Sequence, residues 1–558
     1  MSFDQHPTPA AMDHASGAQL LALGRSLLSG AAAPPGTEVS TGSSIVVASL
    51  SRPAASAVVA GGQGPTVAAA MAVAIRSLRE RATQAGAEDG TLRIDIVRDR
   101  GYQRISESPG RVLIDPSAEG VWFPSSGVIL LPDELMSRRL IGDDKIVRRR
   151  RLLRYVLERD SRELPVEPEW SYVPIRFDTF VEEGSGAIGL VRGNVATQVA
   201  GPDQLMESAV SGGEYLLRHQ FDNGEFGYTY KPWSNTYDDD YNLLRHAGTT
   251  YALLELYRAT RDERFRRGGE NGIEALLRYA RPPRADDPKA SFEAIVGPEG
   301  AAKVGGAGLA ILALTEYEKA TGDARWQERA LNLAGFLLHQ LELSGHFVSK
   351  YFYEEEGDNL DSIYYPGEAI LALCRLYRLR PDQRLLEAAT RAARWLITVR
   401  DRKVVTDRLP HDHWLLMGLN ELVDLTSDEL FQSHAFRIAN AIVAKQHVDP
   451  PHPDWAGGFY VPPRSTPTAT RSEALVAASE LAERSGMDRK IYIDVLAKST
   501  RFQRRCQFDR FNTWFLPRPD LALGGFREHL TSWEVRIDYV QHNASSLLGF
   551  RSLLLGER

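Results

Sequence analysis

The chain has 558 residues, of which 43% are hydrophobic and 25% charged, and its formal net charge is −7. This mild acidity gives no electrostatic reason to expect nucleic acid or an anionic membrane as a partner. No apolar run approaches the roughly 20 residues of a membrane span, and the first residues do not read as a secretory signal. The two cysteines, Cys374 and Cys506, form no metal-type pair. We therefore expect a cytoplasmic protein of two to four domains.

The first part of the chain divides into three regions by composition. Residues 1–38 are poor in aromatics and run into SGAAAPPGTEVSTGSS, which predicts a flexible arm with one short helix over 19–28. From about residue 43, β-like runs such as SIVVASL and LRIDIV alternate with helical stretches, which predicts a small α/β domain over 39–180. A passage containing Pro and Gly then predicts a linker over 181–200.

The order of these strands and the segment EGVWFPSSGVILLPDEL resemble the AMMECR1 family. The resemblance implies a similar fold for the α/β domain. The glycine–cysteine motif of that family is absent, so the resemblance assigns no site residue here.

Four consecutive arginines occupy positions 148–151. Apolar residues recur around them at helical spacing, and acidic residues lie at both ends of the segment. This pattern favours a solvated helix face, with a nucleic-acid patch as the alternative.

After residue 200 the chain is repetitive. Five helix-to-helix turns share an aspartate placed to cap the following helix: Asp262, Asp323, Asp382, Asp428 and Asp488. An apolar helix precedes each turn and an amphipathic one follows it, which gives six outer–inner pairs over 201–558. We predict a mainly α fold, an (α/α)6 toroid, with inner helices beginning near Tyr241, Ala307, Glu368, His413, Arg471 and Tyr539. The alternative is an open solenoid, which would need polar capping repeats that the sequence lacks.

Four outer helices end in a glutamine before a loop with Gly or aromatic residues: Gln220, Gln340, Gln446 and Gln507. These loops resemble the QW motifs of squalene-cyclase-like toroids and loops of six-hairpin glycosidases. In both groups the glutamine caps a helix end. The resemblance therefore implies a fold and is silent on chemistry.

In a closed toroid the long loops gather at one mouth, and their densest polar group is Asp238, Asp239 and Asp240, followed by Arg245 and His246. Adjacent carboxylates push their proton affinities apart, which suits general acid and base chemistry. The alternative is helix capping by Asp240 within a solvated acidic loop. His246 is either a core histidine or a site residue, and its neighbouring arginine favours the site.

Three further loops carry candidate residues. Tyr364 and Tyr365 precede Glu368, which either complements a helix dipole or belongs to a sugar subsite with stacking rings. Arg471 and Glu473 are interpreted as a structural ion pair rather than site residues by a small margin. His542 follows Asp538 at the last inner helix, a polar mouth position.

His411, Asp412 and His413 are weak metal candidates, because no third histidine or cysteine is placed beside them. We expect neither a metal nor another cofactor. The sequence also lacks a Walker A loop, a GxGxxG following a strand and a GxSxG elbow.

The repeat count and the aromatic entry loops resemble the six-hairpin glycosidase and sugar-epimerase group, which implies acidic or histidine chemistry across the mouth. We expect a carbohydrate-active enzyme, most simply a glycosidase-like hydrolase, acting on a small molecule or oligosaccharide. The expected catalytic residues are Asp238, Asp239, Asp240, His246 and Glu368. The expected substrate-binding residues are Trp233, Arg245, Tyr364, Tyr365, His411, His413, Trp414, Arg471, Glu473, Asp538 and His542. The alternatives are a cyclase- or transferase-like toroid acting on a peptide or isoprenoid, and a non-catalytic binding toroid. The α/β domain is expected to fold separately and to contribute few groups to the mouth.

Overall fold

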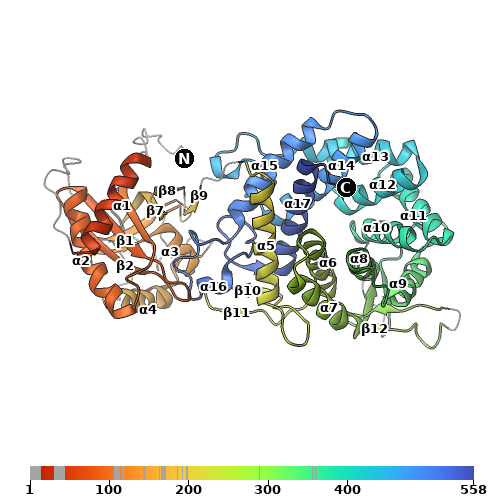
Figure 1. The fold of residues 1–558 in the computed structure, drawn as a ribbon, viewed down its shortest axis with the longest axis horizontal. Coiled ribbons are helices and arrows are strands. Elements are labelled where there is room, and N and C mark those ends of the chain that lie inside the picture. Colours follow the sequence, from red (N-terminus) through yellow and green to blue (C-terminus); the bar gives the residue numbers. More distant parts are fainter. Residues whose placement is uncertain are drawn as a thin grey trace.

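The computed structural model of the chain describes residues 14–30, 44–105, 114–115, 118–142, 146–161, 164, 171–184, 186–191, 193–195, 199–287, 290–354, 357 and 361–557. Most of the predicted flexible arm lies outside these residues. An α/β part and a helical part lie side by side (Figure 1). Within the described ranges, no helix has the length and apolar content needed to cross a membrane.

The N-terminal part is built on one antiparallel sheet with the strand order β2-β1-β3-β7-β5-β6. The long strand β7 pairs with β3, β4, β5 and β8, so it ties the sheet together. The strands are β1 (Ser44–Leu50), β2 (Val58–Gly64), β3 (Leu92–Arg100), β4 (Arg104–Ile105), β5 (Gly120–Phe123), β6 (Val128–Leu130), β7 (Ser171–Glu183), β8 (Gly186–Val191) and β9 (Asn194–Val195). The helices are α1 (His14–Leu28), α2 (Val67–Ala85), α3 (Pro132–Ser137) and α4 (Arg149–Asp160).

Two sequence-based boundaries differ from this arrangement. The helix expected over 19–28 begins at His14, and its apolar side packs into the core of α2 and the sheet. The stretch 181–200, predicted as a linker, contains β8 and β9, which extend the sheet beside β7. Gly184, with φ 56°, follows β7 at the hairpin turn and Gly186 begins β8 opposite Glu183, so the Gly-rich composition marks a turn between strands.

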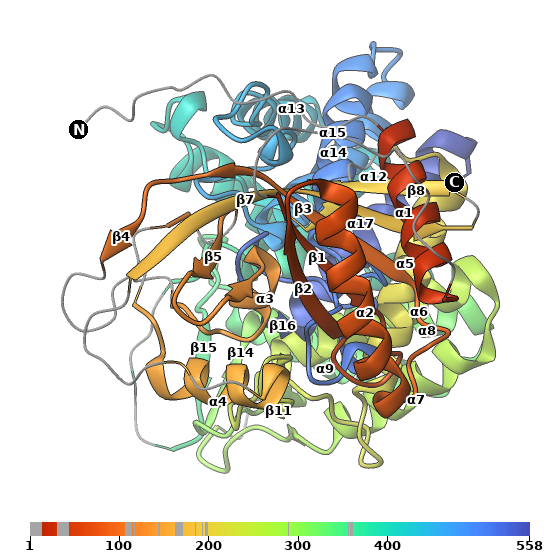
Figure 2. The ribbon, with the colours of Figure 1, turned by 90° about the vertical axis from the view of Figure 1, so that its left-hand side faces the viewer.

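The sheet is covered on both faces, and alternate residues of β1 show how. Val46 and Ala48 belong to a core with α1 and α2, whereas Ile45 and Val47 pack with Trp514 of the helical part. Figure 2 shows α1 and α2 in front of the sheet and the helical part behind it. The two parts of the chain therefore share an apolar interface.

The helical part is a closed ring. Its inner helices contact one another in the order α6, α8, α10, α12, α14, α17 and back to α6. Over the residues described, these are α6 (Leu243–Thr260), α8 (Val304–Thr321), α10 (Tyr365–Leu379), α12 (His413–Thr426), α14 (Ser465–Arg484) and α17 (Ile537–Leu555). The outer helices are α5 (Pro202–Arg218), α7 (Glu263–Leu277), α9 (Gln327–Gln340), α11 (Gln383–Trp395), α13 (Glu429–Val443) and α15 (Lys490–Cys506). The predicted (α/α)6 toroid is confirmed, and the open solenoid is wrong.

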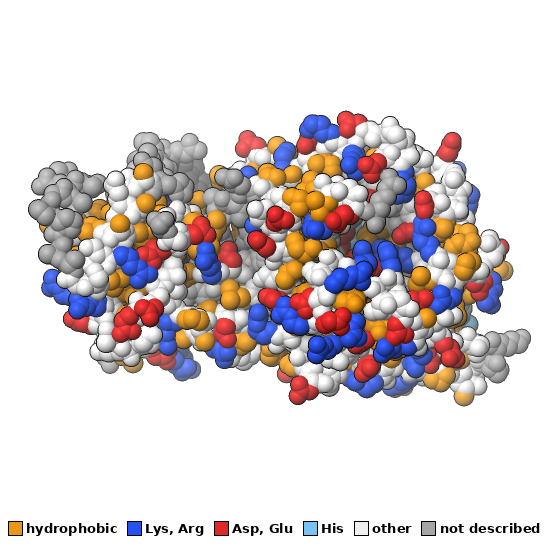
Figure 3. All heavy atoms as spheres, viewed as in Figure 1, with side chains coloured by type: hydrophobic (Ala, Val, Ile, Leu, Met, Phe, Trp, Pro, Cys, Tyr) orange, Lys and Arg blue, Asp and Glu red, His pale blue; other side chains and the backbone are white. Residues whose placement is uncertain are grey.

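Short elements occupy the loops between these helices. They are β10 (Thr229–Lys231), β11 (Thr236–Tyr237), β12 (Ala280–Arg281), β13 (Ala294–Ile295), β14 (Ala301–Lys303), β15 (Lys350–Phe352), β16 (Val535–Arg536), α16 (Pro519–Ala522), a π-helical turn over Leu396–Arg400 and 3₁₀ turns over Thr406–Arg408 and Pro453–Trp455. On the face seen in Figure 3, acidic and basic side chains are interspersed over the toroid.

The local signals in the turns work as predicted. In each of the five short turns the aspartate side chain accepts a hydrogen bond from a backbone N–H two residues later, as Asp262 does from Arg264 at 2.9 Å. Each of the four glutamines donates to backbone carbonyls, as Gln340 does to Val348 at 2.9 Å. These bonds satisfy helix ends and loop backbones, so both motifs are structural.

Candidate functional site

The N-terminal ends of the inner helices bring the long loops together. Arg245 near the start of α6 pairs with Asp538 of α17 at 3.1 Å, which links the first and last inner helices. Arg536 also pairs with Asp538, and the Arg245 guanidinium donates to the hydroxyl of Tyr228. Both predicted residues, Arg245 and Asp538, thus lie at the mouth. Their ion pair joins the first and last inner helices, and this junction is the seam at which the ring closes.

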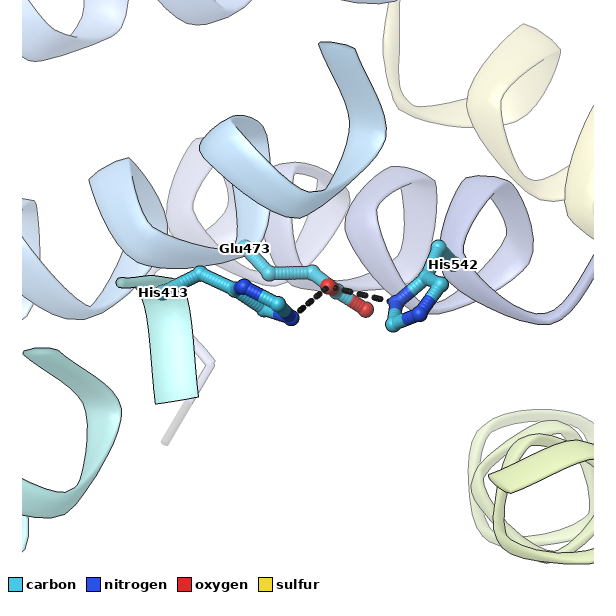
Figure 4. A group of neighbouring side chains, drawn as sticks. All are labelled: His413, Glu473 and His542. Carbon is cyan, nitrogen blue, oxygen red and sulfur yellow. Dashed lines mark hydrogen bonds and ion pairs between the residues drawn. The ribbon is translucent and has the colours of Figure 1, made fainter. Parts of the chain in front are cut away.

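Three side chains from consecutive inner helices meet beside this seam: His413 of α12, Glu473 of α14 and His542 of α17. Glu473 Oε2 lies 2.9 Å from His542 Nδ1 and 4.0 Å from His413 Nε2. The two imidazole rings are 5.5 Å apart between centroids. Figure 4 shows the carboxylate of Glu473 lying between the two rings. Three inner helices therefore converge on one ionisable cluster.

The two histidines have opposite protonation tendencies. Burial lowers the pKa of His413 well below its usual range, and the nearby His542 and Arg471 charges lower it further. Burial also opposes protonation of His542, but the charge and hydrogen bond of Glu473 outweigh that effect and raise its pKa. The neutral form of His413 is therefore favoured, while His542 holds its proton more tightly than a free histidine does.

His413 has no hydrogen-bond partner among the described residues at either ring nitrogen, although it is only 4% exposed. Its ring lies 4.9 Å from Trp414 and 5.6 Å from Tyr364, between centroids. Tyr364 is 46% exposed, whereas Trp414 is buried. A buried imidazole without partners is costly unless a ligand completes its hydrogen bonds. His413 is thus the side chain here that most strongly points to a bound molecule.

Glu368 lies in the first turn of α10 and is buried. Burial raises its pKa to about 8, and the negative charge of Asp412 adds to the rise. Its Oε2 atom has no hydrogen-bond partner among the described residues. A Cβ atom on Gly305 of α8 would lie 2.1 Å from that oxygen and 2.5 Å from Tyr365. The glycine therefore makes the space in which the carboxyl group sits.

Asp412 and His411 precede α12. Asp412 caps this helix by accepting from Leu415 N at 3.0 Å, and burial raises its pKa to about 6 against the opposing charge of Arg400. His411 accepts a hydrogen bond at Nδ1 from Arg471 Nε at 2.9 Å, and burial lowers its pKa to about 4. Arg471 also donates to the hydroxyl of Tyr460. The predicted ion pair between Arg471 and Glu473 is wrong, because each residue has a different partner.

The acidic run over 238–240 does not join the cluster. Asp238 forms an ion pair with Lys231, and Asp239 and Asp240 are exposed. Asn242 caps α6, accepting from Arg245 N, so Asp240 does not have the expected capping role. Contiguous acids repel one another and remain hydrated in an exposed loop.

His246 faces the outer helix instead of the cluster. The hydroxyl of Tyr241 donates to its Nδ1 at 2.6 Å, and its Nε2 donates to the carbonyl of Gly272 in α7 at 2.7 Å. Burial lowers its pKa to about 4. Both nitrogens serve to join α6 to α7, which supports the core-histidine alternative.

Trp233 lies apart from the His413 cluster, at the boundary with the α/β part. The guanidinium of Arg139 lies over its ring, 4.6 Å from the centroid. Met136, Arg139 and Ile141 line a cavity of about 130 Å³ together with Trp233 and residues 528–529 and 531–534. The N-terminal part therefore contacts the long loops at the mouth of the toroid, which the sequence did not predict.

A second charged network, also unforeseen, lies further along the inner helices. Glu255 accepts from Tyr251 at 2.6 Å and from Ser545 at 2.5 Å, and Arg375 donates to Tyr251 at 2.7 Å. Arg258 pairs with Glu316 at 2.5 Å. The side chains of this network bind one another and connect neighbouring inner helices. We therefore interpret the network as structural.

His413, Glu473 and His542 could also hold a divalent cation, because their ligand atoms lie within 4.8 Å of one another. Two histidines and a carboxylate are common ligands of zinc and iron. The sequence did not place these three together, because they are 60 and 69 residues apart and belong to different hairpins. The expected absence of a metal remains a prediction.

A scan against protein-family models and a search of curated proteins found no match. Among solved structures, the chain is similar to a cellobiose 2-epimerase from Bacillus thermoamylovorans, with 14% identity over 63% of this chain and 100% of that one and a TM-score of 0.48. It is also similar to an α-1,6-mannanase from Salegentibacter, with 14% identity over 63% and 99% and a TM-score of 0.44. An unsaturated glucuronyl hydrolase specific for heparin matches with 14% identity over 64% and 99% and a TM-score of 0.45.

These names include both enzyme types of the predicted resemblance, a glycoside hydrolase and a sugar epimerase. At such identities and TM-scores the likeness carries no argument about activity, and the toroid is established by its own ring of contacts. None of these comparisons supports the AMMECR1 resemblance.

Proposed function

We propose that the protein is a sugar-processing enzyme whose chemistry is proton transfer at the His413–Glu473–His542 cluster. The observation that carries the proposal is the pairing of two histidines: His413 has no hydrogen-bond partner among the described residues and burial favours its neutral form, whereas the Glu473 carboxylate favours the protonated form of His542. One ring is prepared to accept a proton and the other to donate one, with their centroids 5.5 Å apart.

Such a pair suits isomerisation or epimerisation next to a carbonyl group. His413 removes the proton from the carbon beside the carbonyl of an open-chain sugar, and the C–H electron pair forms the carbon–carbon double bond of an enediol. The carbonyl oxygen takes the proton held by the His542–Glu473 pair. Return of a proton to either carbon, with loss of the hydroxyl proton on the other carbon to the His542–Glu473 pair, restores a carbonyl compound, so no oxidant or reductant is needed.

The surroundings of the cluster support a sugar as the substrate class. Tyr364, which is 46% exposed, places an aromatic ring beside His413, where it can stack on the apolar face of a sugar, and the buried Trp414 packs against the same imidazole. Glu368 and Arg471 add hydrogen-bonding groups for hydroxyls from α10 and α14. This polar setting does not match the apolar, aromatic-lined cavity expected of a cyclase that acts on an isoprenoid.

Glycoside hydrolysis is the second candidate, favoured by Glu368. With a pKa of about 8 this group is protonated at neutral pH, as a general acid must be. The negative charge of Asp412 contributes to this rise in the pKa of Glu368, so Asp412 is the second carboxylate beside the general acid. The residues expected to act with Glu368, Asp238 to Asp240, lie outside the cluster and are not part of this proposal.

Solvent exchange separates the two chemistries. The protein is incubated in D₂O with mannose, fructose and cellobiose, and deuterium at the carbon beside the carbonyl is followed by NMR. We expect incorporation that His413→Asn and His542→Asn both abolish. Release of nitrophenol from nitrophenyl glycosides, lost in Glu368→Gln and kept in His413→Asn, would instead establish hydrolysis. Neither activity, with sugar binding retained, would favour a non-catalytic toroid.

A further inference from the structure

Arg471 of α14 is a buried cation at the mouth of the toroid, and it is 7% exposed. Three of its five N–H groups donate hydrogen bonds, to Nδ1 of His411 at 2.9 Å, to the carbonyl of Pro467 at 2.8 Å and to the hydroxyl of Tyr460 at 3.1 Å. The Nδ1 atom of His411 accepts, so it carries no proton, and burial lowers the pKa of this histidine to about 4. All three partners of the guanidinium group are therefore neutral.

The acidic side chains around the cluster have cationic partners of their own. Three pairs account for them: Asp412 with Arg400 at 3.2 Å, Asp538 with Arg245 at 3.1 Å and Glu473 with His542 at 2.9 Å. Glu368 is buried, which favours its protonated, uncharged form. Among the described residues, no carboxylate lies within ion-pair distance of Arg471, so its positive charge is not balanced at short range.

Two other buried arginines show what is specific to this one. Arg93 of β3 is 1% exposed and forms ion pairs with two aspartates, which is how a buried charge is usually stabilised. Arg527 also lacks a carboxylate contact among the described residues, but it lies at the interface between the two parts and donates to Asn194 of β9. Arg471 lies instead beside the candidate active site, where a bound molecule can supply the missing anion.

Two tyrosines connect Arg471 with the open side of the mouth. Tyr460 is 49% exposed and Tyr364 is 46% exposed. The guanidinium group of Arg471 lies over the ring of Tyr460, 4.8 Å from its centroid, and its charge contributes to the lowered pKa of His413. Tyr460 has a left-handed backbone conformation, φ 74°, which is costly for a residue other than glycine and is typical of functional sites. Arg471 thus lies between a strained, exposed aromatic residue and the histidine cluster.

We propose that the substrate is a sugar acid whose carboxylate is bound by Arg471. This inference rests on the proposed function and names the substrate class of the same site. Two N–H groups of Arg471 have no acceptor among the described residues, and a carboxylate offers two oxygens and one negative charge. A single arginine balances that charge, whereas a phosphate dianion would keep one charge unbalanced. In an open-chain hexuronate the carboxylate is at the opposite end from the aldehyde, so binding it leaves the reacting carbons free to meet His413.

Calorimetric titration of the full chain tests the proposal with matched probes. Glucuronate is compared with glucose and with glucuronamide, which keeps the shape of the acid without its charge, and galacturonate with galactose covers a second arrangement of hydroxyls. We expect at least one acid to bind about tenfold or more tightly than its neutral counterparts. Glucose 6-phosphate should bind more weakly than that acid. Binding requires no turnover, so the result does not depend on the proposed proton transfer.

Arg471→Gln should abolish the preference for the acid, and Arg471→Lys should keep part of it, because lysine retains the charge but loses the planar fork. Arg464→Gln is the control, since this guanidinium group also lies over the ring of Tyr460, at 4.9 Å, but is paired with Glu528 at 3.5 Å. The control should leave the preference unchanged.

Three results would overturn the proposal: no acid binding more tightly than its neutral counterparts in the wild type, an acid preference that persists in Arg471→Gln, or tighter binding of glucose 6-phosphate than of either acid. The first and third need no variant, so they decide the question even if Arg471→Gln does not fold. Acid-selective binding without deuterium exchange beside the carbonyl would contradict the proposed function alone. Exchange with neutral sugars and no acid preference would contradict only this inference.

Discussion

The Nδ1 atom of His542 lies 2.9 Å from Oε2 of Glu473, and this contact favours the protonated form of His542. The carboxylate raises the pKa of His542 against the effect of burial, while His413, 4.0 Å from the same oxygen, has a pKa well below its usual range. The carboxylate beside His542 and the burial of His413 thus separate the two histidines into a proton donor and a proton acceptor.

The first prediction concerns the alkaline limit of activity. Because Glu473 raises the pKa of His542, the pair keeps its proton to a higher pH than a free histidine would, and loses activity when the proton leaves. Glu473→Gln removes the negative charge and leaves burial, which lowers the pKa of His542. We expect the alkaline limb of the pH–rate profile of kcat to move to lower pH. An unmoved limb would mean that another group sets it.

The second prediction uses two adjacent glycines of α8. A Cβ atom at Gly305 would lie 2.1 Å from the Glu368 carboxyl oxygen, the flexible end of its side chain, whereas at Gly306 the nearest atom is 3.5 Å away. Gly305→Ala should therefore displace the carboxyl group, together with the Tyr365 ring 2.5 Å from the same Cβ position, without unfolding the helix, and Gly306→Ala should fit. We expect kcat/KM to fall at least about tenfold in the first variant alone, or about 1.4 kcal/mol of transition-state stabilisation. Equal activities would show that the position of the Glu368 carboxyl group is immaterial.

The fold was predictable because its signals are local. Asp262 and its four counterparts cap helices from within one turn, and Gln340 bonds to a loop that it adjoins in sequence. Neither contact depends on how distant segments pack. The boundary at 181–200 failed for the opposite reason, since β8 is defined by its pairing with β7 and glycine content cannot distinguish a hairpin turn from a linker.

The site was predictable in place but not in detail. The first turns of the inner helices hold Glu368 and His413 as expected, because topology alone brings those turns together. Which histidine points inward depends on helical phase, and His246 points to α7. The protonation of a carboxyl group depends on its burial, and the burial of Asp238, Asp239 and Asp240 could not be predicted from their adjacency in the sequence. Tyr460 and Gly305 gave no signal that separates them from structural residues of their types.

The third prediction concerns metal. Glu473 already accepts a hydrogen bond from His542, so a cation must displace that proton before it binds all three ligand atoms. We expect purified protein to contain no stoichiometric metal and EDTA to leave turnover unchanged. Added zinc should inhibit by occupying the cluster, and His542→Ala should remove zinc binding as measured by calorimetry. One tightly bound metal per chain, with activity lost on chelation, would refute the acid–base assignment.

The fourth prediction follows from the buried carboxyl of Glu368. Its pKa is raised from 4.5 to about 8 in the folded chain, so the folded state holds a proton that the unfolded state releases between these values. The stability contributed by the protonated group is therefore lost as pH rises from about 4.5 to 8, at about 1.4 kcal/mol per pKa unit.

Glu368→Gln removes this titration. Relative to the wild type, its Tm should be equal near pH 5 and higher at pH 9 by an amount corresponding to a few kcal/mol, even though turnover falls. Glu328→Gln, at an exposed position of α9, should show no such pH dependence. Scanning calorimetry at the two pH values measures the difference, and a variant less stable than the wild type at high pH would contradict the buried, protonated state.

The fifth prediction concerns the interface between the two parts. Phe511, Trp514 and Phe515 extend from the loop after α15 into the apolar core of the sheet, where they are at most 8% exposed. Ser56 Oγ and Ala57 N donate hydrogen bonds to carbonyls of the same loop, each at 2.8 Å. Burial of each large apolar side chain contributes about 2–3 kcal/mol.

The α/β part therefore covers aromatic residues of the toroid. This shared core favours folding of the two parts together over the expected separate folding. We expect a chain starting near residue 200 to aggregate, and Trp514→Ala in the full chain to lower the free energy of unfolding by about 3–5 kcal/mol. Phe221→Ala, at a toroid residue that is 47% exposed, should change it by less than about 1 kcal/mol. Chemical denaturation measures both variants. A soluble, monomeric toroid fragment with unchanged stability would show that the shared core is dispensable.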